Sequence, residues 1–331
     1  MFSRRVFVFL SVTSLLLTGC STVTKVLSEP VMRNELSGRE GTNGPVLVVK
    51  IDDSAQAHPQ IGLEDADIVY IEQVEGGLTR LAAIFSSVIP QRIGPVRSAR
   101  ISDIDILSQF GRVAFAYSGA QKKLLPVIAS ANLQDLGAQR QSPVIYTTDP
   151  DRTQPYAMVL RADLLMQLIA EKSYQIDVAK NVGFQYGELQ EGGVATIKAD
   201  MHWPAATYSA TWSSDESRWL LTHNSSVNVA DSGIVLGPTT LVIQMVSITD
   251  SEYKDKVGGV TPFSQTVGTG KAYVLRDGQR FVTTWNRPFA DSGTTFTFED
   301  GTVMNFDPGQ IWIALTDREP DFVSPPMPET K

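Results

Sequence analysis

The hydrophobic pattern of this 331-residue chain changes near Ala195, and the two parts predict different folds. From Pro45 to about Tyr186, short apolar runs typical of strands alternate with stretches whose apolar residues recur at helical spacing. This alternation predicts an α/β layered domain. Beyond Ala195 the helical spacing disappears and strand-like runs follow one another. That pattern predicts a mainly antiparallel all-β domain, either a sandwich or a barrel.

The same patterns give the expected elements and boundaries. In the first part we expect strands at residues 46–51, 68–71, 78–85 and 113–117, and helices at 102–110, 121–130 and 161–172. In the second part we expect strands at 207–212, 240–246, 270–275, 281–285, 294–298 and 310–315, with hairpin turns at Asp277-Gly278 and Asp300-Gly301. The expected boundaries are an α/β domain at 44–186, a linker at 187–198, a β domain at 199–316 and a disordered tail at 317–331.

The first twenty residues resemble the signal peptide of a bacterial lipoprotein. Two arginines precede an apolar stretch at residues 6–17, which is too short for a comfortable membrane span. The sequence Leu-Thr-Gly-Cys at 17–20 is similar to a lipobox, so removal of residues 1–19 would leave Cys20 carrying lipid, typically palmitate, on its sulfur and amine. An uncleaved anchor helix is the alternative. We expect a protein held by lipid at the extracytoplasmic face of the cell membrane, with residues 20–43 as a tether.

Composition narrows the classes of function. Cys20 is the only cysteine, so no intrachain disulfide can form. A formal net charge of −8 argues against nucleic acid as a partner, because phosphate contacts dominate that affinity. The histidines His58, His202 and His223 have no metal-ligand spacing, and the sequence contains neither a phosphate-binding loop nor a Gly-x-Ser-x-Gly elbow. Whether the protein is an enzyme stays open at this stage.

Charge is segregated along the first part. Residues 51–79 contain seven acids and no lysine or arginine, whereas residues 76–102 contain four arginines and no acid. The charge of the side chains changes from negative to positive at Gly76-Gly77, a dipeptide typical of a two-residue hairpin turn. Such a turn places Glu75 opposite Leu78 and Gln73 opposite Arg80. Glu75 and Arg80 would then be diagonal neighbours on one face and could form a cross-strand ion pair.

The segment 92–100, which reads RIGPVRSAR, predicts an anion site. It ends just before Ser102-Asp103-Ile104-Asp105, whose S-x-x-D form is typical of a helix start, where backbone N–H groups favour an anion. The fork of an arginine matches phosphate or carboxylate oxygens. The predicted ligand-binding residues are Arg80, Arg97, Ser98 and Arg100, with Arg92 as a solvated loop residue. The alternative is that these arginines only pair with the preceding acids.

Two aspartates end the first expected strand. In α/β sheets this is a frequent position for ligand-binding groups. Asp52 or Asp53 could hold a magnesium ion beside a phosphate, because hard cations prefer carboxylate oxygens, and Asp52 could instead act as a catalytic base. A turn or helix cap is the alternative role for both.

Several stretches together resemble a known family. They are residues 59–63, 66–70, 74–80 and 94–100, and more loosely 277–278, 284–287 and 308–313. These motifs are similar to those of the YerB-like lipoproteins, a bacterial family whose two domains lack an assigned biochemical function. The chain departs from the family pattern at His58, where arginine is usual, and at Ile71, where glutamate is usual. It also has Pro155-Tyr156-Ala157 where Pro-His-Asn is usual, so a catalytic role of that histidine in relatives would be lost here.

Three functions remain open. The order of strand, arginine loop and helix, followed by Tyr117-Ser118-Gly119, is similar to the LytR-CpsA-Psr phosphotransferases, which use arginines to hold a lipid-linked pyrophosphate. The chain could bind an anionic, phosphate-bearing envelope ligand or a partner protein that presents one. It could instead be an enzyme acting on phosphorylated cell-envelope precursors. The third function is a purely structural interaction protein of the wall-synthesis or division machinery.

Overall fold

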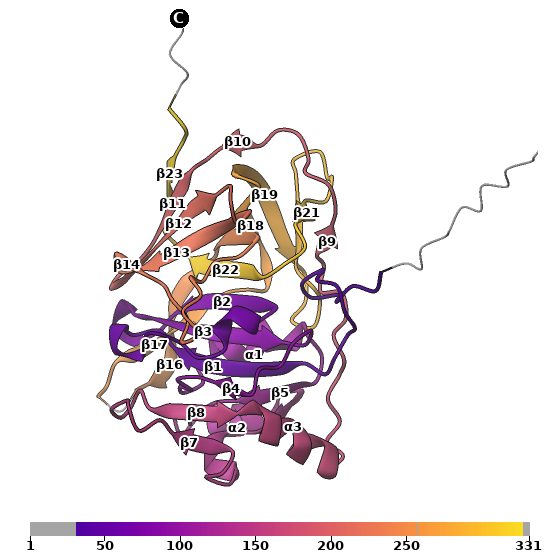
Figure 1. The fold of residues 1–331 in the computed structure, drawn as a ribbon. Helices are drawn as coiled ribbons and strands as arrows, with labels where there is room; N and C mark the ends of the chain where they lie inside the picture. Colours follow the sequence, from indigo (N-terminus) through magenta and orange to yellow (C-terminus); the bar gives the residue numbers. More distant parts are fainter. Residues whose placement is uncertain (1–30, 256, 327–331) are drawn as a thin grey trace, which may run out of the picture. The chain divides into compact units, whose positions relative to one another are not determined.

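The computed structural model describes residues 31–255 and 257–326 (Figure 1). None of the helices formed by these residues combines the length and the apolar composition of a membrane span. The signal peptide expected at residues 1–19 and the lipid site Cys20 lie outside the described residues. The expected tether is wrong for its described part from Met32 onward, because this segment packs onto the fold. Leu36 and Ser37 are fully buried there, and the Ser37 hydroxyl donates to Asp67 Oδ1 at 2.6 Å.

A mixed sheet of eleven strands carries residues from both parts of the chain. In order of pairing it contains β10 (Val194–Ala195), β19 (Gln279–Arg287), β18 (Gly268–Arg276), β15 (Thr240–Met245), β22 (Ile311–Thr316), β2 (Ile68–Gln73), β3 (Thr79–Phe85), β1 (Leu47–Asp52), β5 (Val113–Ala116) and β6 (Leu133–Asp135), with β20 (Thr295–Thr297) paired to β19. Strands β3 and β22 are buried along their whole length, as near-continuous apolar runs predict for strands covered on both faces.

The two parts of the chain meet where β22 pairs in parallel with β2, so that Ile68 lies opposite Ile311. Figure 1 shows β22 in yellow beside β2 in indigo. Ladder hydrogen bonds therefore run from one expected domain into the other. The boundaries at 44–186 and 199–316 stay a prediction. The expected fold class is confirmed in its broad features, since helices occur in the first part and mainly antiparallel strands in the second.

A second sheet of five strands belongs to the second part. It contains β14 (Ser226–Val227), β13 (Arg218–His223), β12 (Ala206–Ser213), β11 (Lys198–Trp203) and β23 (Asp321–Val323). Alternate residues of β11 and β13 are buried, as expected for a sheet with one face on the core. Two of the expected segments differ from the structure: the tail contains β23, which pairs with β11, and the linker contains β10, which pairs with β19.

The remaining elements lie mostly in the first part. The helices are α1 (Ser102–Ser108), α2 (Leu125–Ser130) and α3 (Ala162–Glu171), each within a stretch predicted to be helical. Short strand pairs are β16 (Ile248–Lys254) with β17 (Val260–Ser264), β9 (Gln185–Tyr186) with β21 (Asn305–Phe306), and β8 (Met158–Arg161) with both β4 (Arg92–Ile93) and β7 (Tyr146–Thr148). Single 3-10 turns are η1 (Ala55–Ala57), η2 (Leu63–Asp65), η3 (Glu75–Gly77) and η4 (Ala138–Arg140).

The turn between β2 and β3 differs by one residue from the expected hairpin. Gln73 lies opposite Thr79, and the Val74 N–H donates to the Leu78 oxygen at 2.8 Å. The loop therefore contains three residues, in which Gly76 and Gly77 have φ values of 69° and 74°. The expected two-residue turn is wrong, and Glu75 belongs to the loop instead of the strand. The turn predicted at Asp277-Gly278 is confirmed, because Arg276 and Gln279 pair directly across it.

Candidate functional site

The four predicted ligand-binding residues line one cavity of about 650 Å³, here named the arginine cavity. Among the described residues, its cationic side chains are Arg80, Arg97, Arg100, Lys122, Lys123 and Lys254, and its carboxylates are Glu75 and Asp255. Residues from β3, from the loop before α1, from the segment before α2 and from the β16–β17 hairpin contribute to the lining. Both parts of the chain therefore build the cavity, and its charge is opposite in sign to that of the whole chain.

Arg80 is a buried cation on β3. Its side chain donates from Nη1 to the Ser98 main-chain oxygen at 2.8 Å, and the residue is 9% exposed. Among the described residues, no carboxylate forms an ion pair with it. Burial, together with the positive charges of Arg100 and Arg97, lowers the pKa of Arg80 to about 9. The guanidinium stays charged at neutral pH without a neutralising partner in direct contact.

Arg97 is held at the cavity wall by contacts on three sides. Its Nε lies 2.5 Å from Asp52 Oδ2, and its guanidinium carbon lies 5.9 Å from the centre of the Tyr156 ring. Its main-chain N–H donates to the Lys50 oxygen at 2.8 Å, which fixes the loop against β1. Asp52 also accepts hydrogen bonds from Ser54 and does not line the cavity. The suggested catalytic base thus serves as the partner of Arg97.

Glu75 pairs with Arg100. The Nε and Nη2 atoms of Arg100 donate to Glu75 Oε2 at 2.9 and 2.7 Å, and the Thr261 hydroxyl donates to Oε1. Burial alone would raise the pKa of Glu75, but the hydrogen bonds and charge of Arg100 outweigh it and the pKa is lowered. The expected ion pair between Glu75 and Arg80 is wrong, because the three-residue loop turns Glu75 toward the segment that precedes α1.

A buried charged triad of Lys50, Glu72 and Asp103 contacts the segment 92–100. Asp103 accepts a hydrogen bond from the Arg100 main-chain N–H at 2.7 Å and another from Lys50 Nζ at 2.8 Å. Lys50 also pairs with Glu72, and all three triad side chains are fully buried. Burial and the charge of Asp103 raise the pKa of Glu72 to about 7, against the attraction of Lys50. The capping box expected at 102–105 is not formed: α1 has no side-chain cap, and the Ser102 hydroxyl instead accepts a hydrogen bond from the Ser264 N–H at 3.0 Å.

Arg92 lies apart from these residues. It belongs to the short strand β4, its side chain is 45% exposed, and Nη2 lies 3.6 Å from Asp149 Oδ2. It does not line the arginine cavity. It therefore offers a matched comparison for the cavity arginines.

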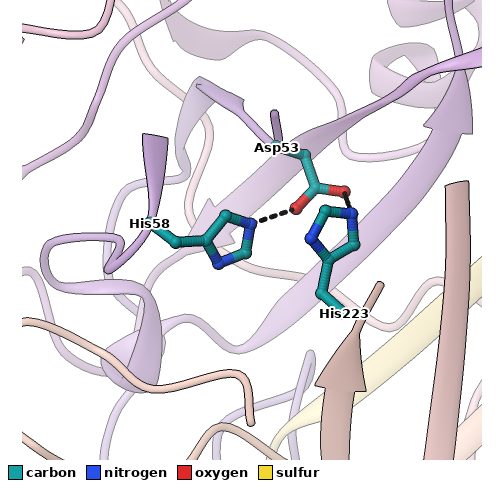
Figure 2. A group of neighbouring side chains, drawn as sticks. All are labelled: Asp53, His58 and His223. Carbon is teal, nitrogen blue, oxygen red and sulfur yellow. Dashed lines mark ion pairs between the residues drawn. The ribbon is translucent and has the colours of Figure 1, made fainter. Parts of the chain in front are cut away.

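A second polar cluster joins the two sheets (Figure 2). His58 Nε2 lies 3.3 Å from Asp53 Oδ1, and His223 Nε2 lies 3.8 Å from Asp53 Oδ2. The hydroxyls of Tyr208 and Thr79 also donate to the Asp53 carboxylate, at 2.7 and 2.5 Å. Burial would raise the pKa of Asp53, but His58, His223 and Thr79 outweigh it and lower the pKa.

Burial lowers the pKa of His223 despite the nearby Asp53 carboxylate. No sequence pattern indicated the cluster, since His58 and His223 lie about half the chain apart and no local spacing links them. The magnesium site suggested for Asp52 and Asp53 does not fit the geometry: Asp52 bonds to Arg97, and Asp53 faces imidazoles, whereas magnesium prefers oxygen ligands.

Comparisons with known proteins place the chain in a family. Residues 34–175 match the family described as "Protein of unknown function (DUF3048) N-terminal domain", and residues 197–313 match the corresponding C-terminal domain. The chain is 24% identical over 295 residues to "Putative lipoprotein YerB" of Bacillus subtilis (strain 168), covering 88% of this chain and 86% of that protein.

A solved structure has the same fold. The crystal structure of YerB from Bacillus subtilis superposes with a TM-score of 0.75 at 18% sequence identity, covering 88% of this chain and 99% of that one. The family resemblance predicted from the sequence motifs is confirmed by the sequence matches. The chain belongs to the DUF3048 family and carries both its N-terminal and its C-terminal domain.

Proposed function

We propose that the protein is a lipid-anchored binding protein of the cell envelope, whose arginine cavity holds an anionic, phosphate-bearing ligand. The observation that carries this proposal is the buried guanidinium of Arg80, which has no carboxylate in direct contact among the described residues. A buried charge without a partner is costly to the fold, and a bound anion would supply the missing partner.

The surroundings of Arg80 suit a phosphate. Two more guanidinium groups, those of Arg97 and Arg100, line the same cavity, and planar arginine forks match phosphate oxygens. Three lysines add positive charge at the cavity lining. A volume of about 650 Å³ is in the range of sites for organic ligands and exceeds the needs of a bare phosphate ion. The ligand is therefore an organic phosphate of the envelope or a phosphate-bearing group on a partner.

The proposal also includes a lipid anchor on Cys20. The sequence Leu-Thr-Gly-Cys at 17–20 supports attachment of lipid to Cys20, and the Bacillus relative carries the name of a lipoprotein. Lipid on Cys20 would hold the cavity at the extracytoplasmic face of the membrane. The proposal covers binding and no reaction, because the carboxylate suggested as a base, Asp52, is held by Arg97 and Ser54.

Calorimetric titration with inorganic pyrophosphate tests the proposal. The protein used begins at residue 21, which removes the lipid site and keeps every described element. We expect saturable binding that weakens about tenfold or more in Arg97→Gln and in Arg100→Gln, since each change removes charged hydrogen bonds. Arg92→Gln is the control and should bind like the unaltered protein. Equal binding in all three variants would reject the arginine cavity as the site.

A further inference from the structure

The cluster around Asp53 has the geometry of an unassigned metal site. His58 Nε2, Asp53 Oδ1 and the Gln60 side-chain amide form a triangle with separations of 3.3, 3.1 and 3.4 Å. Ligand atoms about 2.1 Å from a tetrahedral zinc ion lie about 3.4 Å from one another. The triangle therefore has the size of one face of that tetrahedron, with the Gln60 Nε2 atom at its third corner.

The contacts of His58 allow its inward-facing nitrogen to bind a metal ion. Its Nδ1 lies 3.2 Å from Asn228 Oδ1 and its Nε2 lies 3.3 Å from Asp53 Oδ1, so both ring nitrogens face an acceptor. With the proton on Nδ1, a metal ion would be bound by the Nε2 lone pair and the Asp53 carboxylate together. A hydrogen bond from the distal nitrogen that fixes the tautomer is the usual support of a metal-binding histidine.

The Gln60 amide supplies an oxygen that lacks a partner. Its Oε1 is buried and accepts no hydrogen bond within the described part of the chain, while Nε2 occupies the triangle. A half-turn of this amide exchanges the two atoms and places the oxygen toward His58 and Asp53. In that orientation Gln60 Oε1, which otherwise has no hydrogen-bond donor in the described residues, could bind the metal ion.

His223 approaches the triangle from the five-stranded sheet. Its Nε2 lies 3.8 Å from Asp53 Oδ2, and the donor atoms of Asp53, His58 and His223 all lie within 4.8 Å of one another. Figure 2 shows both imidazoles beside the carboxylate. The two rings stack with centres 4.6 Å apart and planes 9° apart, so the His223 ring must rotate for its lone pair to face the same ion as that of His58.

We propose that Asp53, His58, Gln60 and His223 bind one first-row transition-metal ion of the zinc type. Two imidazoles with one carboxylate select zinc, cobalt or nickel over magnesium and calcium. Asp53 directly follows β1 and His223 ends β13, so the ion would connect the eleven-stranded sheet to the five-stranded sheet. The role that follows is structural. The site is independent of the proposed function of the arginine cavity, because Asp52 points to Arg97 and the next residue, Asp53, points to the imidazoles.

Cobalt(II) titration of the metal-free protein from residue 21 onward tests the site. We expect visible bands of tetrahedral cobalt that saturate at about one ion per chain. His58→Gln and His223→Gln should each weaken binding at least about tenfold. His202→Gln is the matched control, because this third histidine pairs with Asp321 at the surface and should leave the titration unchanged.

A second measurement avoids dependence on the folding of the variants. X-ray absorption of the zinc-loaded, unaltered protein should show two imidazoles and oxygen ligands in the first shell. Absence of cobalt bands, unchanged titrations in both His58→Gln and His223→Gln, or fewer than two imidazoles around zinc would each overturn the proposal.

Discussion

The Nη1 atom of Arg80 donates to the main-chain oxygen of Ser98 at 2.8 Å, and this is the one hydrogen bond of the Arg80 guanidinium within the described residues. Ser98 belongs to the segment that carries Arg97 and Arg100, so the buried cation is tied to the wall of the same cavity that it lines. This contact orients the guanidinium but neutralises none of its charge. The buried positive charge of Arg80 is therefore in direct contact with no carboxylate of residues 31–255 and 257–326.

Replacement of Arg80 should separate binding from stability. In Arg80→Met the apolar stem is kept and the buried charge is removed, so the desolvation cost disappears while one hydrogen bond to Ser98 is lost. We expect the free energy of unfolding to change by no more than about 1 kcal/mol and pyrophosphate affinity to fall about tenfold or more. Urea unfolding and calorimetry measure the two effects. A loss of several kcal/mol (on the scale of a broken buried network) with unchanged binding would instead make Arg80 a structural residue.

The carboxylate of Glu75 should weaken anion binding. It lines the cavity and occupies the Nε and Nη2 donors of Arg100. In Glu75→Gln the negative charge at the cavity is gone and the contact of residue 75 with Arg100 is weaker, so we expect pyrophosphate affinity to rise several-fold. The unfolding free energy should fall by about 1–2 kcal/mol, because the Arg100 hydrogen bonds lose their charged acceptor. Glu64→Gln, in an acid outside the cavity, is the control, and an equal rise there would point to general charge effects.

Glu72 should make stability fall as pH rises. Its pKa is about 7 in the folded protein and 4.5 in the unfolded chain, so the folded state binds more protons between these values. Stability from this group is fully present below about pH 4.5 and is lost as the pH rises through 7. Glu72→Gln should flatten the pH dependence of urea unfolding across this window. An unchanged slope in Glu72→Gln would show that another group titrates there.

The two glycines of the β2–β3 loop should differ in their tolerance of a side chain. Both have positive φ, so alanine strains each by about 1–2 kcal/mol. A Cβ atom on Gly77 would lie 2.4 Å from the Pro204 Cβ, whereas one on Gly76 would meet nothing within 4 Å. We therefore expect Gly77→Ala to lower the free energy of unfolding by at least about 1 kcal/mol more than Gly76→Ala. Equal losses in urea unfolding would contradict this packing of β11–β12 against the loop.

Local patterns predicted much of the fold. Apolar runs located β1, β2, β3 and β5, and helical spacing located α3, because these signals depend only on neighbouring residues. The pairing of β22 with β2 could not be predicted, since it joins residues more than two hundred positions apart and leaves no local mark. The Gly76-Gly77 pair indicated a turn but did not distinguish a two-residue loop from a three-residue loop, and this difference changed the partner of Glu75.

The candidate site was predictable only where neighbouring residues in the sequence carry the signal. The segregation of acids and arginines identified the segment 92–100, and Arg97 and Arg100 do meet Arg80 at one cavity. Charge pattern alone did not reveal that Arg97 and Arg100 pair with acids, whereas Arg80 pairs with no acid in the described part of the chain. The cluster of Asp53, His58 and His223 had no sequence signal, because it depends on the packing of one sheet on the other.

A tungstate-soaked crystal of the protein from residue 21 onward tests the central claim most directly. Tungstate imitates phosphate and scatters anomalously, so its position can be found without ambiguity. We predict an anomalous peak in the arginine cavity with oxygen atoms about 3 Å from the guanidinium nitrogens of Arg80 and of Arg97 or Arg100. A cavity without anomalous density, in a crystal where tungstate occupies only other surface positions, would contradict the account.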